Sequence, residues 1–411
     1  MTVDRAWAER NLGYDPISRK PPPETFAFKK AAASSAKPED YQREMIDFDS
    51  QGPEGTALFA FSKATGLSRF TDIPWPKGLA PKTGAAPGKG SGALPRADVL
   101  VVTWTVDEGH ALSRVLTPGK DSSNDYRPYK HNYAKIAKTM SRRSPAVMAK
   151  RLGTYWTCTI GKKKVVVFKS DSHMSQDTDK HLPTNDVLPN AVVWKQIIEE
   201  VQPELVLTIG TSGSVFQHFQ LGDVVVTRAA KFRCKDEFRN EKFNGETFQS
   251  DWPIPLTHLD EATSLMQVVG PNMAEPPMLP PTINYHYHGS KIHSDVNVPD
   301  IKLDGRDMPA FHPILTTDYF EYGTSTNNLD VEGAAVEMGD AVLGLAVDGM
   351  PNPPKWAVVR NMSDPQINGG LPNEGYDMNP QTMWAIGYYT GYGYYTSVSG
   401  AIATWGIIAG L

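Results

Sequence analysis

Several polar side chains of this chain stand where buried strands and helices are expected to end or begin. Glu108 follows the apolar run in VLVVTWTVDEGHAL, and Glu332 lies in DVEGAAVEMGD. Arg360, Ser363 and Asp364 crowd the end of another apolar run, KWAVVRNMSD. Ligands of open α/β sheets bind beyond the carboxyl ends of strands. Such a density of polar groups indicates function or tight pairing, although acids in a first helical turn also complement the helix dipole.

A run of small residues, LTIGTSGSV, follows another apolar stretch and contains Gly210 and Thr211. Glycine lets the backbone approach an anion or a sugar closely, and a tight turn is the structural alternative. The run is not a Walker A loop, because no Gly-Lys-Ser/Thr follows, and it lacks the G-x-G-x-x-G dinucleotide fingerprint. The run is therefore expected to be either a ligand-contacting loop or a tight turn, and neither nucleotide-binding motif is present.

Three histidines, His286, His288 and His293, are spaced closely enough to suggest a metal site. No acid or cysteine completes the set at metal-ligand spacing, and tyrosines interleave with them. Ser/His/Asp and Cys/His nucleophile motifs show no local signature. We predict neither a metal nor a cofactor.

The elements expected to position these residues alternate between strand and helix. Helices are expected at DEGHALSRVL, at PNAVVWKQIIEEVQP and at DVEGAAVEMGDAVLGLA, the last with Asp330 as its N-cap and Val331 on its apolar stripe. Strands are expected at ADVLVVTWT, in a hairpin turning at Gly161, and at ELVLTIG, GDVVVTRAAKF and KWAVVRNMSD. This alternation predicts an α/β fold.

The chain divides by composition. Residues 1–95 are rich in Pro, Ala, Gly and Lys with little periodicity, which indicates an accessory arm or linker, although aromatics such as Trp75 suggest that part of it packs. Residues 96–411 form the expected catalytic domain. Within it, the Pro-rich stretch of about 250–314 breaks the pattern and is expected to be an insertion.

Composition limits the classes of function. The 411 residues are 40% hydrophobic and carry a formal net charge of −5, which argues against a nucleic-acid partner. Two cysteines are too few for a disulfide framework. The N-terminal sequence has no apolar signal core, and no run reaches the length of a membrane span. We expect a soluble, cytoplasmic protein without a membrane partner.

Taken in order, the motifs resemble the purine nucleoside phosphorylase and uridine phosphorylase superfamily, and within it the methylthioadenosine/S-adenosylhomocysteine nucleosidases. The matching stretches are VLVVTWTVDEGHAL, LVLTIGTSGSVFQHFQLGDVVV, TTDYF, LDVEGAA and VVRNMSD. The resemblance covers roughly residues 96–395 outside the insertion. It implies a three-layer α/β/α domain with a mixed central sheet, and a homo-oligomer.

On the leaving-group side, the resemblance implies that Asp364 is the general acid at nitrogen 7 of a purine and that Ser363 helps to hold it. Glu332 would bind the ribose 2′-hydroxyl, and Phe320 would stack on the base. The stretch GSKIHSD at 289–295 competes with Phe320 for that position. Since the acid must keep its proton near neutral pH, we expect burial to raise the pKa of Asp364.

On the nucleophile side, the resemblance implies that Glu108 orients and deprotonates the attacking water, with Arg360 beside it. Gly210 and Thr211 would lie where the family holds the nucleophile. Phosphorylases of the superfamily place an arginine just before this loop, where Thr208 stands here. We therefore predict hydrolysis of the N-glycosidic bond of a purine nucleoside or related nucleotide, with adenine as the expected base. A phosphate-dependent phosphorylase and a non-catalytic nucleoside or nucleotide sensor remain the alternatives.

Overall fold

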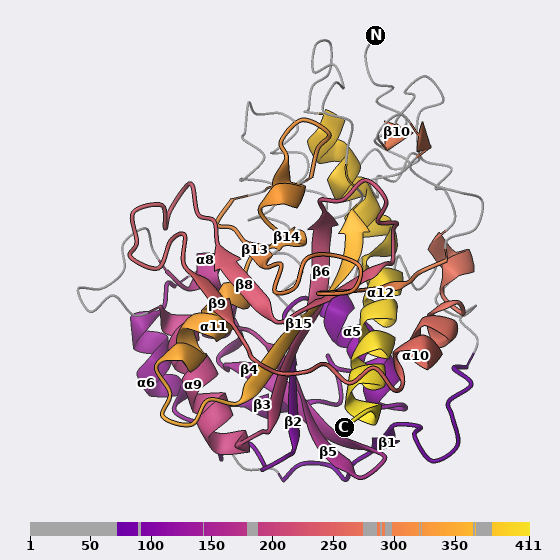
Figure 1. The fold of residues 1–411 in the computed structure, drawn as a ribbon. Helices are drawn as coiled ribbons and strands as arrows, with labels where there is room; N and C mark the ends of the chain where they lie inside the picture. The colour runs from indigo at the N-terminus through magenta and orange to yellow at the C-terminus, as the bar shows by residue number, and fades with distance from the viewer. Residues whose placement is uncertain are drawn as a thin grey trace, which may run out of the picture.

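A computed structural model gives the structure of the chain. It describes residues 72–88, 92–142, 144–178, 188–273, 298–319, 321, 323–364, 366 and 380–411, and the two-residue strands His286–Tyr287 (β10) and Ser290–Lys291 (β11). In this part of the chain a large mixed sheet lies between two groups of helices (Figure 1). The predicted three-layer α/β architecture is confirmed.

Four parallel strands form the centre of the sheet, in the order β5, β2, β6, β15. They span Lys163–Ser170 (β5), Val99–Thr103 (β2), Leu205–Ser214 (β6) and Lys355–Asp364 (β15). Nearly every residue of β2, β6 and β15 is buried, as expected for strands covered by helices on both faces. Their carboxyl ends all point to the same edge.

Antiparallel and parallel strands extend the sheet on both sides. Beyond β5, the predicted hairpin brings in β4 (Gly153–Ile160), and β4 pairs with β3 (Arg127–Tyr129) and β1 (Lys82–Thr83). The turn residue Gly161 has a φ of +58°, a conformation that favours glycine.

Beyond β6 and β15, six shorter strands complete the sheet. They are β7 (Val224–Thr227), β8 (Ala229–Phe232), β9 (Thr247–Gln249), β12 (Ile301–Leu303), β13 (Ile314–Thr316) and β14 (Ala335–Glu337). The expected single strand GDVVVTRAAKF is in fact β7 and β8, interrupted at Arg228, whose guanidinium binds Asp304.

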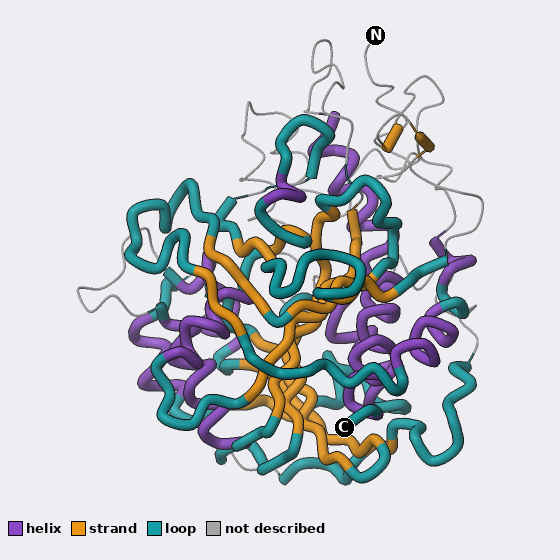
Figure 2. The backbone as a smooth tube through the Cα atoms, viewed as in Figure 1, coloured by secondary structure: helices purple, strands orange, loops and turns teal. Residues whose placement is uncertain are grey.

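Helices cover the two faces separately (Figure 2). On one side α5 (Val106–Leu116) and α10 (Leu259–Met266) pack with α12 (Pro380–Ala409). The other side carries α6 (Tyr133–Ile136), α9 (Pro189–Val201) and α11 (Asp340–Asp348), with the short α7 (Pro145–Ala149) and α8 (Met174–Asp177) nearby. Single 3-10 turns span Ala137–Thr139, Gly270–Met273 and Leu329–Val331. Among the described helices, none combines the length and apolar character needed to span a bilayer.

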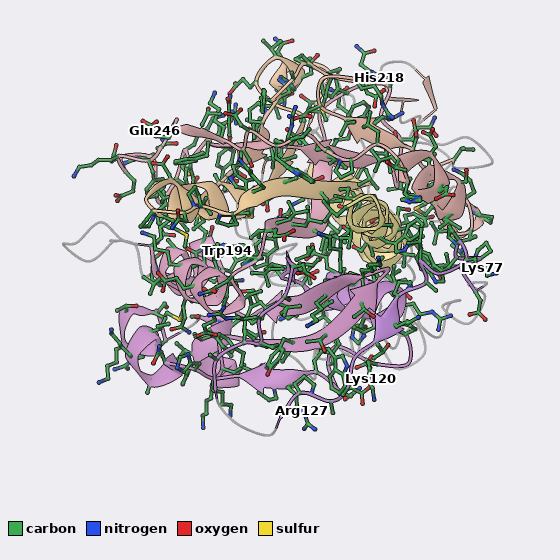
Figure 3. All side chains as sticks on the ribbon, turned by 60° about the horizontal axis from the view of Figure 1, so that its bottom comes forward. Lys77, Lys120, Arg127, Trp194, His218 and Glu246 are labelled. Atoms are coloured by element: carbon green, nitrogen blue, oxygen red, sulfur yellow. The ribbon has the colours of Figure 1, made fainter. Side chains whose placement is uncertain are left out.

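Side chains fill the space between the sheet and each helical layer (Figure 3). Successive residues of a strand point to opposite faces, so Val99 and Val101 join the core under α5 and α12, whereas Leu100 and Val102 join the core under α9 and α11. Trp194 of α9 lies edge-on to Trp104, with ring centroids 6.2 Å apart.

The predicted long helix at DVEGAAVEMGDAVLGLA is wrong. Its first part is a 3-10 turn at Leu329–Val331 followed by strand β14, and α11 begins only at Asp340. Asp330 is therefore not a helix N-cap, and Val331, expected on the apolar stripe, is 78% exposed. Apolar positions that fit a helical period here belong to three different elements.

The small-residue run after ELVLTIG is not a loop, because β6 continues through it to Ser214. The segment of about 250–314, expected as an insertion, contributes β12 and β13 to the main sheet and α10 to a helical layer. Part of the expected arm also packs: Trp75 contacts Trp405 of α12 with ring centroids 4.8 Å apart. The domain boundary at residue 95 stays a prediction.

Candidate functional site

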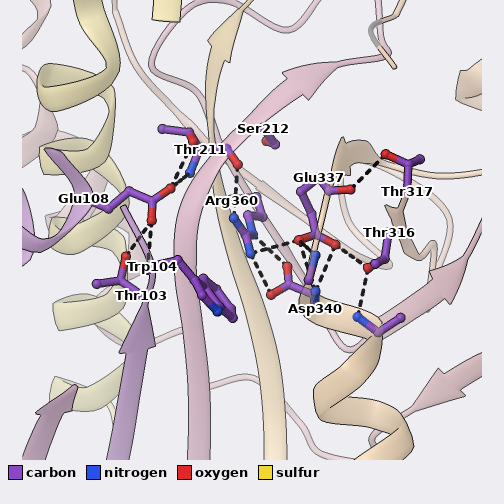
Figure 4. Close-up of polar contacts among 12 residues, drawn as sticks. Thr103, Trp104, Glu108, Thr211, Ser212, Thr316, Thr317, Glu337, Asp340 and Arg360 are labelled. Carbon is purple, nitrogen blue, oxygen red and sulfur yellow. Dashed lines mark hydrogen bonds and ion pairs between the residues drawn. The ribbon is translucent and has the colours of Figure 1, made fainter. Parts of the chain in front are cut away.

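Glu108 lies at the end of β2, in the first turn of α5. Thr105 is the N-cap, and its side chain and that of Glu108 form a reciprocal capping box. Strand β2 ends at Thr103, whereas the neighbouring β6 continues to Ser214. The Glu108 carboxylate therefore lies beside β6, where β2 would have continued. There Oε1 accepts hydrogen bonds from the backbone N–H of Thr211 at 2.8 Å and from its hydroxyl at 2.9 Å (Figure 4).

The other carboxylate oxygen of Glu108 is equally occupied. Oε2 accepts hydrogen bonds from the Thr103 hydroxyl and from the backbone N–H groups of Trp104 and Thr105, at 2.8, 3.1 and 2.9 Å. Burial by itself raises the pKa of this acid, but the charge of Arg360 and these hydrogen bonds outweigh burial and lower it. Glu108 is thus an ionised, fixed carboxylate.

Arg360 projects from β15 toward two buried carboxylates that the sequence analysis missed. Its Nε and Nη2 donate to Asp340 at 2.7 and 2.8 Å, and Nη2 also donates to Glu337 at 3.0 Å. Nη1 donates to the carbonyl oxygen of Thr211 at 3.1 Å, and the guanidinium lies 4.9 Å from the ring centre of Trp104 (Figure 4). The arginine is therefore clamped rather than free.

Glu337 and Asp340 come from the end of β14 and the start of α11. Glu337 accepts hydrogen bonds from the backbone N–H groups of Gly339 and Asp340 and from the Thr316 hydroxyl. Burial and the neighbouring Asp340 raise the pKa of Glu337. One sequence signal could have revealed this pair: Gly339–Asp340, which follows AVEM, is a pattern typical of a helix start. It was missed because a single longer helix was expected to run through these residues.

The glycines of the small-residue run are required by side chains of the chain itself. A Cβ at Gly210 would lie 2.3 Å from Nη1 of Arg360 and 2.8 Å from Oε1 of Glu108. A Cβ at Gly213 would lie 2.9 Å from Oδ2 of Asp364. The expected approach of a ligand to this backbone stays a prediction; the groups that lie against the two glycines in this structure are the side chains of Arg360, Glu108 and Asp364.

We expect Gly210→Ala to reduce turnover about 100-fold, because Arg360 and Glu108 cannot keep their places against a new methyl group; overpacking of this kind costs about 1–3 kcal/mol. Steady-state kinetics and thermal unfolding measure both effects. The matched control is Gly92→Ala, where a Cβ would meet nothing within 4 Å. Full activity in Gly210→Ala would show that the packing around Gly210 does not matter to the site.

Asp364 ends β15 on the far side of β6 from Glu108. Its carboxyl is buried and accepts a hydrogen bond from the Ser363 hydroxyl at 2.9 Å. Burial raises the pKa of Asp364 to about 7, and the Ser363 bond opposes this only in part. The expected elevation of this pKa is thus present in the structure, and within the described residues no ion pair joins Asp364 to a lysine, arginine or histidine.

Thr211 and Gly213 connect the two acids. Alternate residues of a strand face the same side, and Thr211 binds Glu108 while Gly213 lies against Asp364. Two residues of a strand span about 7 Å. Thr211 is partly exposed, unlike its buried neighbours. An ionised carboxylate and an acid that titrates near neutrality therefore flank a stretch of β6 in which Thr211 is partly exposed.

Other predicted site residues lie elsewhere. Glu332 ends the 3-10 turn at 329–331, and its ion pairs are with Arg233 at 3.0 Å and Lys231 at 3.7 Å. The pKa of Glu332 is lowered. Burial alone would raise it, but the charges of Arg233, Lys231 and Lys235 outweigh that effect. No hydrogen bond or ion pair among the described residues links Glu332 to Glu108, Arg360 or Asp364, so its ribose-binding role stays a prediction.

The remaining predictions concern parts of the chain outside the described side chains. Phe320, His288 and His293 lie outside the described residues, and only the backbone of His286 is described, in β10. Within the part that is described, no group of three or more His, Cys, Asp or Glu side chains could hold a metal ion. Cys158 and Cys234 are both buried and free.

Comparison with known proteins gives structural neighbours only. No family model matches the chain, and no curated protein matches it. Solved structures that it resembles include a 5′-methylthioadenosine/S-adenosylhomocysteine nucleosidase from Neisseria meningitidis, with 14% identity over 76% of this chain and 100% of that one, at a TM-score of 0.41.

Two further neighbours are similar in extent. The S-adenosylhomocysteine nucleosidase from Streptococcus pyogenes has 15% identity over 78% of this chain and 99% of its own, at a TM-score of 0.41. The futalosine hydrolase of Helicobacter pylori strain 26695 has 11% identity over 76% and 97%, also at 0.41.

Proposed function

We propose that this protein hydrolyses the N-glycosidic bond of a purine nucleoside or related nucleotide, with adenine as the expected base. The observation that carries the proposal is the pairing, across one strand, of two carboxyl groups whose pKa values are shifted in opposite directions. Asp364 has a pKa raised to about 7 by burial, whereas the pKa of Glu108 is lowered by Arg360 and by its hydrogen bonds.

This division suits a reaction that passes through an oxocarbenium-like state. The leaving base needs a proton, which Asp364 supplies when neutral, and the sugar needs a nucleophile held on the opposite face. Glycoside hydrolysis divides the same work between two carboxyl groups. Ser363 fixes the carboxyl of Asp364, because its hydroxyl donates to Oδ1. Each acid–base contribution is typically worth about 10²–10⁴ in rate.

The charge around Arg360 favours water over phosphate as the nucleophile. Asp340 and Glu337 occupy its Nε and Nη2, and the pKa of Arg360 itself is raised because its acidic neighbours outweigh desolvation. One guanidinium faces three acidic side chains, counting Glu108. A phosphate dianion requires unoccupied cationic donors, and this cluster would repel it. Phosphorolysis is therefore the second candidate.

We expect free adenine to appear from adenosine-type substrates in phosphate-free buffer, at a rate that added phosphate does not raise. Chromatography of nucleosides and nucleotides incubated with and without phosphate makes the measurement. Base release that depends on phosphate would replace hydrolysis by phosphorolysis. Stoichiometric binding in calorimetry without any base release, even overnight, would instead identify a sensor.

A further inference from the structure

The connection between β13 and β14 lies against the end of β6, beside Asp364. Its described residues are 317–319, 321 and 323–334. A Cβ at Gly213 would lie 3.8 Å from the carbonyl oxygen of Glu321 and 2.9 Å from Oδ2 of Asp364. A Cβ at Gly323 would lie 2.9 Å from Cα of Val215, just beyond β6. The main chain of this connection therefore packs directly on the part of β6 that adjoins Asp364.

The side chain of Glu321 is bound by Arg233, the residue that follows β8. Nη1 of Arg233 donates to Oε2 of Glu321 at 2.7 Å and to the Tyr319 hydroxyl, which in turn donates to Oε2 of Glu321 at 2.7 Å. Nε of Arg233 donates to Oε2 of Glu332 at 3.0 Å, near the other end of the connection. One guanidinium therefore joins the first and the last part of the β13–β14 connection.

Arg233 is itself held in place. Its backbone N–H donates to the carbonyl oxygen of Thr316 at 2.8 Å. The buried carboxylate of Asp318 accepts hydrogen bonds from the backbone N–H groups of Lys235 and Phe238, at 2.9 and 2.7 Å. The chain after β8 and the start of the connection are thus fixed to each other. A guanidinium presents its donors in a rigid fork, so a fixed arginine can hold two carboxylates in defined positions.

The connection acts on Asp364 through burial. Burial raises the pKa of Asp364 to about 7, and the Ser363 hydroxyl opposes this only in part. The titratable side chains of the described part of the connection are Asp318, Tyr319, Glu321, Asp330 and Glu332. Within the described residues, no hydrogen bond or ion pair joins any of them to Asp364. The main chain at Glu321 is therefore part of what shields this carboxyl from water.

We propose that Arg233 is a positioning residue of the site, which binds both ends of the β13–β14 connection and so keeps the main chain of Glu321 beside Asp364. This inference rests on the proposed function, in which Asp364 is the general acid. Without Arg233, the carboxylates of Glu321 and Glu332 would repel each other and the connection would loosen from β6. Water would then reach Asp364 and favour its ionised form.

Loss of position and loss of charge act on Asp364 in opposite directions. A nearby cation stabilises a carboxylate, so removing the charge of Arg233 alone would raise the pKa of Asp364. Admitting water to the buried carboxyl would lower this pKa. The direction of the change therefore distinguishes a positioning role from a purely electrostatic one.

The test is the pH dependence of kcat/KM for Arg233→Met in the full chain, with adenosine as the probe. In wild type we expect kcat/KM to fall with a midpoint near pH 7. In the variant we expect a midpoint near about pH 6, so that the loss relative to wild type is small at about pH 5 and about tenfold at pH 8, because one pH unit is a factor of ten in the protonated fraction.

Two further variants separate position from charge. Arg233→Lys keeps the charge but cannot bind both carboxylates in the same geometry, and it should lower the midpoint by a smaller amount. Lys231→Met is the matched control, because it removes a cation from β8 that lies 3.7 Å from Glu332. We expect this control not to lower the midpoint.

A second measurement needs no turnover. Replacing Asp364 by Asn increases Tm by a margin that grows with pH only up to the folded-state pKa of Asp364. In the wild-type background this margin should stop growing near pH 7. In the Arg233→Met background we expect it to stop growing near about pH 6.

The outcomes separate the two proposals. A wild-type protein that releases no base from any nucleoside contradicts the proposed function, and the Tm measurement then still tests the role of Arg233. A midpoint that is unchanged or raised in Arg233→Met, or an equal loss of kcat/KM at every pH, overturns the role of Arg233 and leaves hydrolysis standing. If Arg233→Met does not fold, Arg233→Lys supplies the same comparison with Lys231→Met.

Discussion

Asp364→Asn should abolish measurable turnover of purine nucleosides, with a loss of at least about 10²–10⁴ in kcat/KM. An amide of the same shape can still accept the Ser363 hydrogen bond, but it has no proton to deliver to the leaving base. In wild type we expect kcat/KM to fall as the pH rises through about 7, because Asp364 loses the required proton there. Steady-state kinetics across pH 5–9 measure both effects.

Stability provides the control for this variant. A folded-state pKa above the unfolded value means that folding favours neutral Asp364 and loses stability as the pH rises past the unfolded pKa. Asparagine never ionises, so Asp364→Asn should melt no lower than wild type, by a margin that grows from about pH 4 to about pH 7 and stays constant above that. Asp348→Asn, an exposed acid at the end of α11, should change neither property. Retained activity in a folded Asp364→Asn protein would remove Asp364 as the general acid.

The sequence predicted the frame of the site well because its strands are buried on both faces. Continuous apolar runs identified β2, β6 and β15, and polar residues at their ends identified Glu108, Arg360 and Asp364. The N-terminal proline and apolar spacing identified α9. These signals are local: each depends on a few consecutive residues, so no knowledge of tertiary contacts was needed.

The partners of Arg360 escaped prediction because they depend on a tertiary contact. Apolar residues of 331–345 fit a helical period, yet β14 forms there since Ala335 and Val336 pair with both β13 and β6. Gly333 was a residue in the sequence that argued against a helix here. The structure shows why it is glycine, because a Cβ at this position would lie 2.6 Å from the Pro313 carbonyl oxygen. A glycine inside an expected helix can thus mark close strand packing.

Arg360→Met should be the most destabilising single change in the site. Methionine keeps much of the bulk, but it leaves the buried Glu337, Asp340 and Glu108 without their cation. Breaking a buried ion pair from one side costs about 3–5 kcal/mol, which corresponds to a fall in Tm of roughly 10 °C for a domain of this size. We also expect kcat to fall, because the positive charge beside Glu108 is lost.

Two further variants serve as controls for Arg360→Met. Arg114→Met breaks an exposed pair with Asp72, whose charged atoms are 3.4 Å apart at the surface, and should barely change Tm, since exposed pairs contribute little. Adding Glu337→Gln and Asp340→Asn to Arg360→Met should recover much of the lost stability but not the activity, because the uncompensated charge is removed while the arginine is still missing. A fall in Tm no larger than that of Arg114→Met would mean that the cluster is not what stabilises the ends of β6 and β15. Recovery of stability with activity would mean that Arg360 supports the fold alone, and the nucleophile would then be held by other groups.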